Sequence, residues 1–262
     1  MALTRRVDAF ARKALVIAEL EARKMRRDPT ELLTRAIQPA IWILVFGTVM
    51  ARANAIPSGV PYLDFLAPGI LAQSVLFVAI FYGIAVIWER DLGVLQKFLA
   101  SPTPRAAIVL GKGLSAGVRS LSQTLLVYLL AVVLGVHLDL NPLAILGVLA
   151  FVACGASFFA TLSILLASLV RSRERFLGIG QILTMPLFFA SNAIYPITQM
   201  PAWLQAVARL NPLTYLVEAL RSLMLAGQFD ALLVAKDAAV LAVATGVAVY
   251  LGGRVYARIV TG

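Results

Sequence analysis

The sequence has little of what a metal site, a disulfide or a soluble surface needs. Its 262 residues include one cysteine and one histidine, and only 14% of them are charged. One cysteine cannot form a disulfide within the chain. One cysteine and one histidine cannot build a zinc cluster or an HExxH site either. We therefore expect no metal and no cofactor in this chain, and we interpret Cys154 as a packing residue.

Charged residues of either sign are missing from six long stretches of the chain. These runs cover residues 36–51, 65–88, 120–138, 140–170, 176–208 and 238–253. An ion-driven carrier would need titratable groups inside such runs. A membrane-embedded enzyme would need a nucleophile and a base within one leaflet. The sequence favours neither class, because the runs hold no acidic side chain.

What the chain has in abundance is apolar surface, since 61% of its residues are hydrophobic. A membrane-spanning helix needs roughly 20 mainly apolar residues, and each run can hold most or all of one. The sequence therefore predicts an all-α integral membrane protein with six transmembrane helices. We expect residues 1–262 to form a single transmembrane domain.

The positive charge is distributed unevenly, and its placement predicts the topology. Of the 23 Lys and Arg residues, 19 lie in 1–35, 89–119, 171–175 and 254–258, and the other four lie in the alternate connections. The side richer in Lys and Arg is cytoplasmic by the positive-inside rule. We therefore expect a multi-pass protein of the plasma (inner) membrane with both termini in the cytoplasm. The net charge of +10 therefore reflects membrane topology, and we expect no nucleic-acid partner.

Two segments fit the membrane surface better than its interior. Residues 1–31 contain an amphipathic helix, with Val7, Phe10 and Ile17 on one face and Arg12 and Arg23 on the other. Such a helix lies in the membrane interface. A cytosolic packing helix is the alternative.

Residues 193–231 connect the fifth and sixth predicted spans, yet many of them are apolar. Pro201 can open one short helix, and Asn211 with Pro212 supplies the cap and first residue of another. A free aqueous loop is rarely so apolar. We therefore predict two re-entrant helices that dip into the outer leaflet.

The chain has one weak likeness to a nucleotide-binding loop, at residues 110–113. A P-loop needs a glycine five positions before the glycine of its Gly-Lys pair and a Ser or Thr after the lysine. Ala106 and Gly113 occupy those places. Lys112 is therefore interpreted as an interfacial charge, and we expect no ATP hydrolysis by this chain alone. Gly113 and Gly117 have the small-xxx-small spacing of closely packed helices.

The connection after the second span combines charges with apolar anchors. Residues 89–100 read as a short helix outside the bilayer that ends before Pro102 and Pro104. The segment resembles the membrane subunits of type-2 ABC exporters, as do Asp28-Pro29, Gln38-Pro39, Phe46-Gly47, Phe65-Leu66-Ala67-Pro68-Gly69-Ile70 and Asn211-Pro212-Leu213-Thr214-Tyr215 with Arg221. The likeness covers nearly the whole chain.

The resemblance implies a permease that forms a homodimer and pairs with two copies of a cytosolic ABC ATPase, which carries the ATP and Mg. It further implies that segment 89–104 is a coupling helix seated on that ATPase. The residues expected in that contact are Glu89, Arg90, Asp91, Gly93, Val94, Leu95, Lys97 and Phe98. The short outer helices resemble an exit gate, for which the candidate residues are Asn192, Pro196, Trp203, Asn211 and Pro212.

The substrate stays open at this level. An amphiphilic drug or a lipid-like molecule is favoured by overall similarity, and a polysaccharide or lipid-linked glycan is the alternative. A substrate site is expected between the two copies, near the first, second and fifth spans, without assigned residues.

Overall fold

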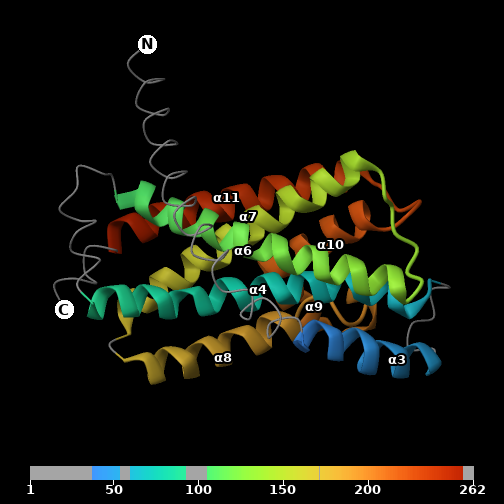
Figure 1. Ribbon diagram of the computed structural model, residues 1–262, viewed down its shortest axis with the longest axis horizontal. Helices are drawn as coiled ribbons and strands as arrows, with labels where there is room; N and C mark the ends of the chain where they lie inside the picture. The colour runs from blue at the N-terminus through green and yellow to red at the C-terminus, as the bar shows by residue number, and fades with distance from the viewer. Residues whose placement is uncertain (1–36, 54–59, 93–104, 171, 256–262) are drawn as a thin grey trace, which may run out of the picture.

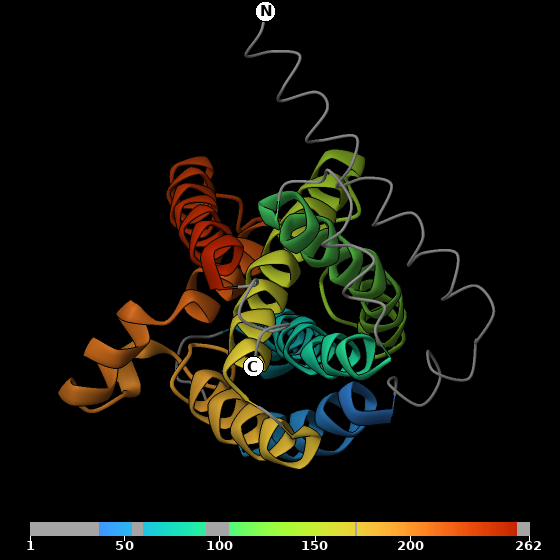
Figure 2. The same ribbon diagram turned by 90° about the vertical axis from the view of Figure 1, so that its left-hand side faces the viewer.

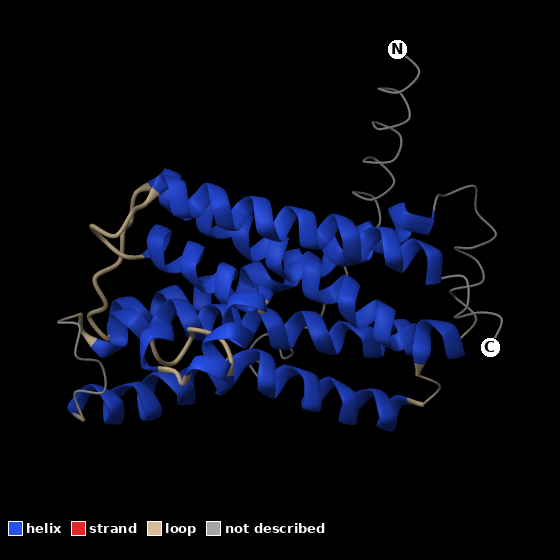
Figure 3. Cartoon of the chain, turned by 180° about the vertical axis from the view of Figure 1, so that it is seen from behind, coloured by secondary structure: helices blue, strands red, loops and turns tan. Residues whose placement is uncertain are grey.

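The computed structural model describes residues 37–53, 60–92, 105–170 and 172–255. These residues are helical apart from turns and one isolated bridge between Leu138 and Leu225 (Figure 3). The all-α prediction is confirmed for this part of the chain. The amphipathic helix predicted at 1–31 and residues 93–104 lie outside the described residues.

Four helices are long and apolar enough to cross a membrane, and they run along the long axis of the bundle (Figure 1). They are α4 (Tyr62–Asp91), α6 (Arg105–Val133), α7 (Pro142–Leu169) and α11 (Ala231–Val255). Shorter helical elements are η1 (Trp42–Gly47), α3 (Thr48–Arg52), α8 (Arg173–Phe189), η2 (Ile197–Gln199), α9 (Ala202–Leu210) and α10 (Pro212–Met224). Elements η1 and α3 belong to one apolar helix, Ile37–Arg52.

Helix α4 lies at the centre of the bundle, in contact with α6, α7, α8 and α10 (Figure 2). Almost every residue from Phe65 to Leu76 is buried. A helix that is apolar on all sides has no face for water, so it lies in a protein core or in a membrane. The apolar run 65–88 is therefore consistent with this position, which the packing of the other helices determines.

Helices α6 and α7 approach each other closely where α6 carries glycine. A Cβ added at Gly117 would lie 3.3 Å from the Cα of Ala153, and one at Gly113 would lie 3.1 Å from the carbonyl oxygen of Ser157. The prediction that Gly113 and Gly117 mark a close helix contact is confirmed. Cys154 is partly buried against the core, with its Sγ 4.0 Å from Thr245 Oγ1.

Asparagine caps begin two of the helices, α7 and α10. The side chain of Asn141 accepts a hydrogen bond from Leu143 N at 3.0 Å, and Asn211 does the same for Leu213 N. Proline follows each cap at the first helical position, where its missing N–H costs nothing. The predicted cap of the second short helix at Asn211 is thus confirmed, and α7 begins at Pro142, inside the charge-free run 140–170.

Several helix boundaries differ from the prediction. The second predicted span, 65–88, is longer as α4, so Glu89, Arg90 and Asp91 form its last turn instead of opening a separate helix. The third predicted span, 119–136, begins earlier, because α6 is continuous from Arg105. The sixth, 238–253, starts already at Ala231. Charge-free runs underestimate these helices because polar residues near helix ends pair with one another.

Two acidic side chains are also buried, which corrects the expectation that the spans offer no titratable candidate. Asp64 in the first turn of α4 is 6% exposed, and Asp237 in the second turn of α11 is fully buried. Both residues flank the charge-free runs. They are buried because other elements pack over these helix ends, which the sequence pattern alone does not reveal.

Candidate functional site

Ionic contacts join helix ends at the end of the bundle where α4 terminates. We call this the charged end and define it by Glu89, Asp91, Lys112 and Arg173. Lys112 of α6 forms an ion pair with Glu89 of α4, and the lysine is only 1% exposed. Arg173 Nη2 donates to Asp91 Oδ2 at 2.8 Å. The charged end therefore ties α4 to α6 and to α8.

Arginine side chains complete this arrangement. Arg90 Nη1 donates to the carbonyl oxygen of Val170 at 3.2 Å, just after α7 ends. The guanidinium of Arg173 lies over the Trp88 ring, 3.4 Å from its centroid. A planar guanidinium can stack on an aromatic ring while its N–H groups bind a carboxylate. Four helices thus meet through a few side chains.

These contacts change the interpretation of Lys112. Its side chain is buried within the bundle, a burial that the sequence did not predict, and its place at the membrane interface stays a prediction. A phosphate-binding lysine follows a loop whose backbone N–H groups face the ligand. Lys112 instead lies within a continuous helix and pairs with Glu89.

The three described residues of the predicted ATPase contact, Glu89, Arg90 and Asp91, are thus held together at the charged end. Gly93, Val94, Leu95, Lys97 and Phe98 lie outside the described residues. The role of the whole segment in coupling stays a prediction.

At the opposite end of the bundle, α10 packs against the start of α4. We call this the α10 end and define it by Asn192, Glu218, Arg221 and Asp237. Arg221 Nη2 donates to the carbonyl oxygens of Phe65 at 3.1 Å and Asn192 at 2.9 Å. The guanidinium also lies 3.8 Å from the centroid of the Phe65 ring. Arg221 therefore joins α10, α4 and the segment after α8.

Arg221 keeps its positive charge in this setting. Burial lowers the pKa of its guanidinium to about 10, and the nearby carboxylate of Glu218 raises it. Glu218 also accepts a hydrogen bond from Asn192 Nδ2 at 3.2 Å, and its other carboxylate oxygen lies 3.7 Å from Lys236 Nζ. The α10 end is thus a network of alternating charges.

Several buried polar atoms of this network have no hydrogen-bond partner within the described part of the chain. They are Asn192 Oδ1, Arg221 Nε and both carboxylate oxygens of Asp237. Lys236 Nζ approaches Asp237 Oδ1 only to 3.5 Å. A pocket of about 310 Å³ lies beside the network, lined by Phe65, Asn192, Pro196, Ile197, Thr198, Glu218, Arg221, Ser222, Gln228 and Leu233.

The structure brings together some of the five predicted gate residues and separates others. Asn192 and Pro196 line this pocket. Asn211 donates to the carbonyl oxygens of Leu187 at 2.7 Å and Ala190 at 3.2 Å, so it ties the start of α10 to the end of α8. Pro212 follows it as the first residue of α10. Trp203 on α9 is 69% exposed and contributes to no part of the network.

Sequence reasoning left Arg221, Glu218 and Asp237 out of the candidate residues. Arg221 carried a signal, because it is the one Lys or Arg between Arg209 and Lys236 in an otherwise apolar stretch. Glu218 lies one helical turn before it. A pair of opposite charges in an apolar segment indicates a specific buried contact.

Comparison with known proteins gives one consistent result. A family described as "ABC-2 type transporter" matches residues 13–225. A "putative transport permease" of Cyanophora paradoxa is 30% identical over 226 residues, which cover 82% of this chain and 74% of that protein.

Two further relatives have names that state a biological role. A "daunorubicin resistance ABC transporter permease protein" of Streptomyces coeruleorubidus is 29% identical over 200 residues, which cover 75% of this chain and 69% of that protein. "Nodulation protein J" of Rhizobium leguminosarum bv. trifolii is 28% identical over 196 residues, 74% of each chain.

Proposed function

Because this chain belongs to the ABC-2 type transporter family, whose members are membrane permeases of ABC transporters, we propose that it exports an amphiphilic drug or lipid-like molecule from the cytoplasm. In this proposal, ATP hydrolysis by a separate ATPase subunit drives export. The relative named for daunorubicin resistance supports a drug-like substrate. Two copies of this chain and two copies of the ATPase would form the exporter.

The α10 end is the observation that carries export. Its pocket of about 310 Å³ is lined from α4, α10 and the segment after α8, and the buried polar atoms of the network keep unused hydrogen-bonding capacity. Atoms that lack partners in one arrangement can find them in another. In this proposal the short helices α9 and α10 are re-entrant, and the α10 end opens toward the outside to release substrate.

The charged end supports the complementary role at the cytoplasmic face. Its ion pairs join α4 to α6 and α8, and the Arg90 hydrogen bond to Val170 O adds the end of α7, so a push on the adjacent segment 93–104 would reach all four helices. In this proposal that segment is the coupling helix, and Gly93 and Leu95 lie in a groove on the ATPase. Glu89 is a poor probe of coupling, because its carboxylate pairs with Lys112 within the chain.

Two substitutions test coupling without touching the described contacts. We would purify tagged Gly93→Trp and Leu95→Asp proteins from native cells and measure co-purified ATP hydrolysis. In the same cells we would measure export of daunorubicin, normalised to permease in the membrane. Both variants should lose the ATPase and export, by steric exclusion and by a charge placed in an apolar socket. Parental values in both would overturn the coupling role.

The six-span topology, with both termini in the cytoplasm of the plasma membrane, has its own test. In a Cys154→Ala background, Ser58→Cys and Leu140→Cys should react with an impermeant maleimide on intact cells. Lys97→Cys and Glu174→Cys should react only after permeabilisation. Labelling of position 97 from outside would contradict the topology and the direction of transport.

A further inference from the structure

A second pocket lies halfway along the bundle, away from both ends. It has a volume of about 280 Å³ and is lined by Gln38, Pro39, Ser74, Phe77, Val78, Phe81 and Gln123. Helix α4 forms its floor, the apolar helix Ile37–Arg52 one wall and α6 the other. Residues 74–81 occupy the middle of the 30-residue α4. The pocket is thus at mid-depth in a helix long enough to cross the bilayer.

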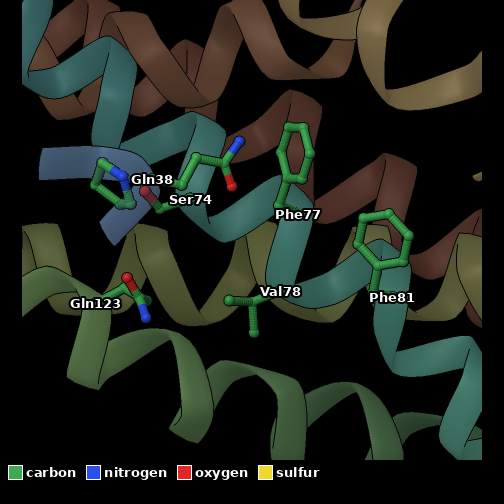
Figure 4. Close-up of a pocket in the computed structure, with 7 residues that line it drawn as sticks. Gln38, Ser74, Phe77, Val78, Phe81 and Gln123 are labelled. Carbon is green, nitrogen blue, oxygen red and sulfur yellow. The ribbon is translucent and has the colours of Figure 1, made fainter. Parts of the chain in front are cut away.

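One wall of this pocket holds a polar atom without a partner. Gln123 is 2% exposed, and its Oε1 accepts no hydrogen bond from any described residue. Figure 4 shows its side chain rising from α6 toward α4, on the side where the pocket lies. A buried carbonyl oxygen left unpaired is costly, whereas a partner that donates a hydrogen bond removes the cost.

The remaining walls combine apolar rings with a few polar groups. Phe77 and Phe81 are half-buried, with ring centroids 6.0 Å apart, and stand along the same side of α4 (Figure 4). The Ser74 hydroxyl already donates to Ile70 O at 2.8 Å, so it can still accept but offers no second proton. Gln38 is exposed and brings an amide to the rim. Apolar walls with a few convergent polar groups are typical of small-molecule sites.

We propose that this pocket binds a compact aromatic amphiphile that donates a hydrogen bond to Gln123 Oε1. Its volume is near the lower end of ligand pockets, roughly 300–1,000 Å³, so it suits a small ring system rather than a sugar chain. As a loading site for transported molecules, it rests on the proposed export function. The pocket then takes substrate at mid-depth between two membrane helices, apart from the pocket at the α10 end.

The test compares two fluorescent probes, 2-naphthol and 2-methoxynaphthalene, in which a methyl group of the second replaces the hydroxyl hydrogen of the first. Only 2-naphthol can donate to Gln123. In nanodiscs, after subtraction of probe partitioned into empty discs, the protein should bind 2-naphthol roughly fivefold more tightly, the factor expected of one net hydrogen bond. Gln123→Leu should bind both probes equally. Phe77→Ala should weaken both and keep their ratio.

The matched control is Gln181→Leu, the same change at an exposed position on α8 outside the pocket. It should keep the fivefold preference. Gln123→Leu should also be as heat-stable as the parent, because the change removes an unpaired polar atom rather than a contact. Loss of preference together with a lower melting temperature would assign Gln123 a structural role and overturn the proposal. An equal affinity for both probes in the parent would do the same.

Two further measurements distinguish a bilayer lipid from a transported molecule as the occupant of the pocket. If added phosphatidylethanolamine, whose headgroup donates hydrogen bonds, displaces 2-naphthol from the parent but not from Gln123→Leu, the binding site stands and its occupant is a bilayer lipid. In cells, 2-naphthol should inhibit daunorubicin export by the parent and require about fivefold more for Gln123→Leu. Binding without inhibition would overturn the loading role alone. If the parent protein itself exports no daunorubicin, that result counts against the proposed function. The binding assay does not depend on export and tests the pocket separately.

Discussion

The two ends of the bundle treat buried polar groups in opposite ways. At the charged end, Lys112 and Arg173 hydrogen-bond to the carboxylates of Glu89 and Asp91. At the α10 end the cation beside Glu218 and Asp237 is Lys236, whose Nζ lies 3.7 Å and 3.5 Å from their carboxylate oxygens. At the α10 end, Asn192 Oδ1, Arg221 Nε and the oxygens of Asp237 lack hydrogen bonds within the described chain. A paired network holds one arrangement, because breaking it strands a charge. A network with unpaired groups loses fewer hydrogen bonds when it rearranges, so the rearrangement costs less free energy.

Under the proposed function, this difference would give the two ends of the bundle different roles in transport. A force applied at the charged end would be transmitted through rigid contacts. The response would appear at the α10 end, where α8, α10 and the start of α4 meet through Arg221, Asn192 and Asn211. The following substitutions test whether one end is rigid and the other adaptable.

The largest effect is expected from Glu89→Ala. The change removes the carboxylate partner of Lys112, which is 1% exposed. Removal of one member of a buried pair costs about 3–5 kcal/mol. The protein should unfold at lower temperature in detergent and accumulate less in the membrane.

The double variant Glu89→Ala/Lys112→Met should recover most of that loss, because no charge is then left behind. Glu174→Ala, at an exposed acid near the charged end, is the matched control and should match the parent. An equal loss in Glu89→Ala and in the double variant would show that the ion pair is not what holds this end.

Arg221→Met should have the next largest effect. It removes hydrogen bonds from a charged group to the carbonyl oxygens of Phe65 and Asn192, a loss of about 2 kcal/mol. Equilibrium unfolding in mixed micelles would measure the cost. Arg209→Met, an exposed arginine of α9, should cost almost nothing.

The Arg221→Met variant also tests whether the α10 end acts as a gate. If that end is a gate, the variant should leak daunorubicin without ATP in vesicles, since α10 is no longer tied to α4. If Arg221→Met loses stability as expected but its vesicles do not leak daunorubicin, Arg221 contributes to stability alone.

Gly69→Ala tests how tightly α4 is packed against the segment after α8. The added Cβ would collide with the backbone of Ala193, which cannot rotate out of the way. Overpacking of this kind costs about 1–3 kcal/mol. Gly178→Ala is the control, because nothing lies within 4 Å of its Cβ position on α8. The control should be neutral or slightly more heat-stable, since alanine favours helices.

Much of the fold follows from the sequence, and the reasons are physical. The run 65–88 predicted a membrane-spanning helix because it is long and apolar enough, and Asn211-Pro212 predicted a helix start because capping is a local interaction. Close packing at Gly113 and Gly117 also followed from spacing alone. These signals depend on neighbours within a few residues.

The contacts that form both ends could not be predicted in the same way. Glu89 and Lys112 are 23 residues apart in the chain, and Phe65 and Arg221 are 156 apart. No periodicity links such pairs. Charged residues at 89–91 indicated a surface segment, yet they extend α4 because partners from α6, α7 and α8 satisfy them. The burial of Asp64 and Asp237 likewise depends on tertiary packing.

The smallest effect is expected where the charged end is most open to solvent, at Arg173 and Asp91. Their side chains are 33% and 37% exposed, so water and salt screen the pair. A double-mutant cycle with Arg173→Ala and Asp91→Ala should give a coupling energy of about 0.5 kcal/mol, typical of exposed pairs. The pair should weaken further in 1 M NaCl.

By contrast, the coupling energy between Glu89 and Lys112 should be several times larger and barely respond to salt, because Lys112 is shielded from solvent. Equal couplings with equal salt dependence would remove the distinction between a buried core and a solvated rim at this end. Rigidity would then have to come from the packing of α4 against α6 and α7 rather than from charge.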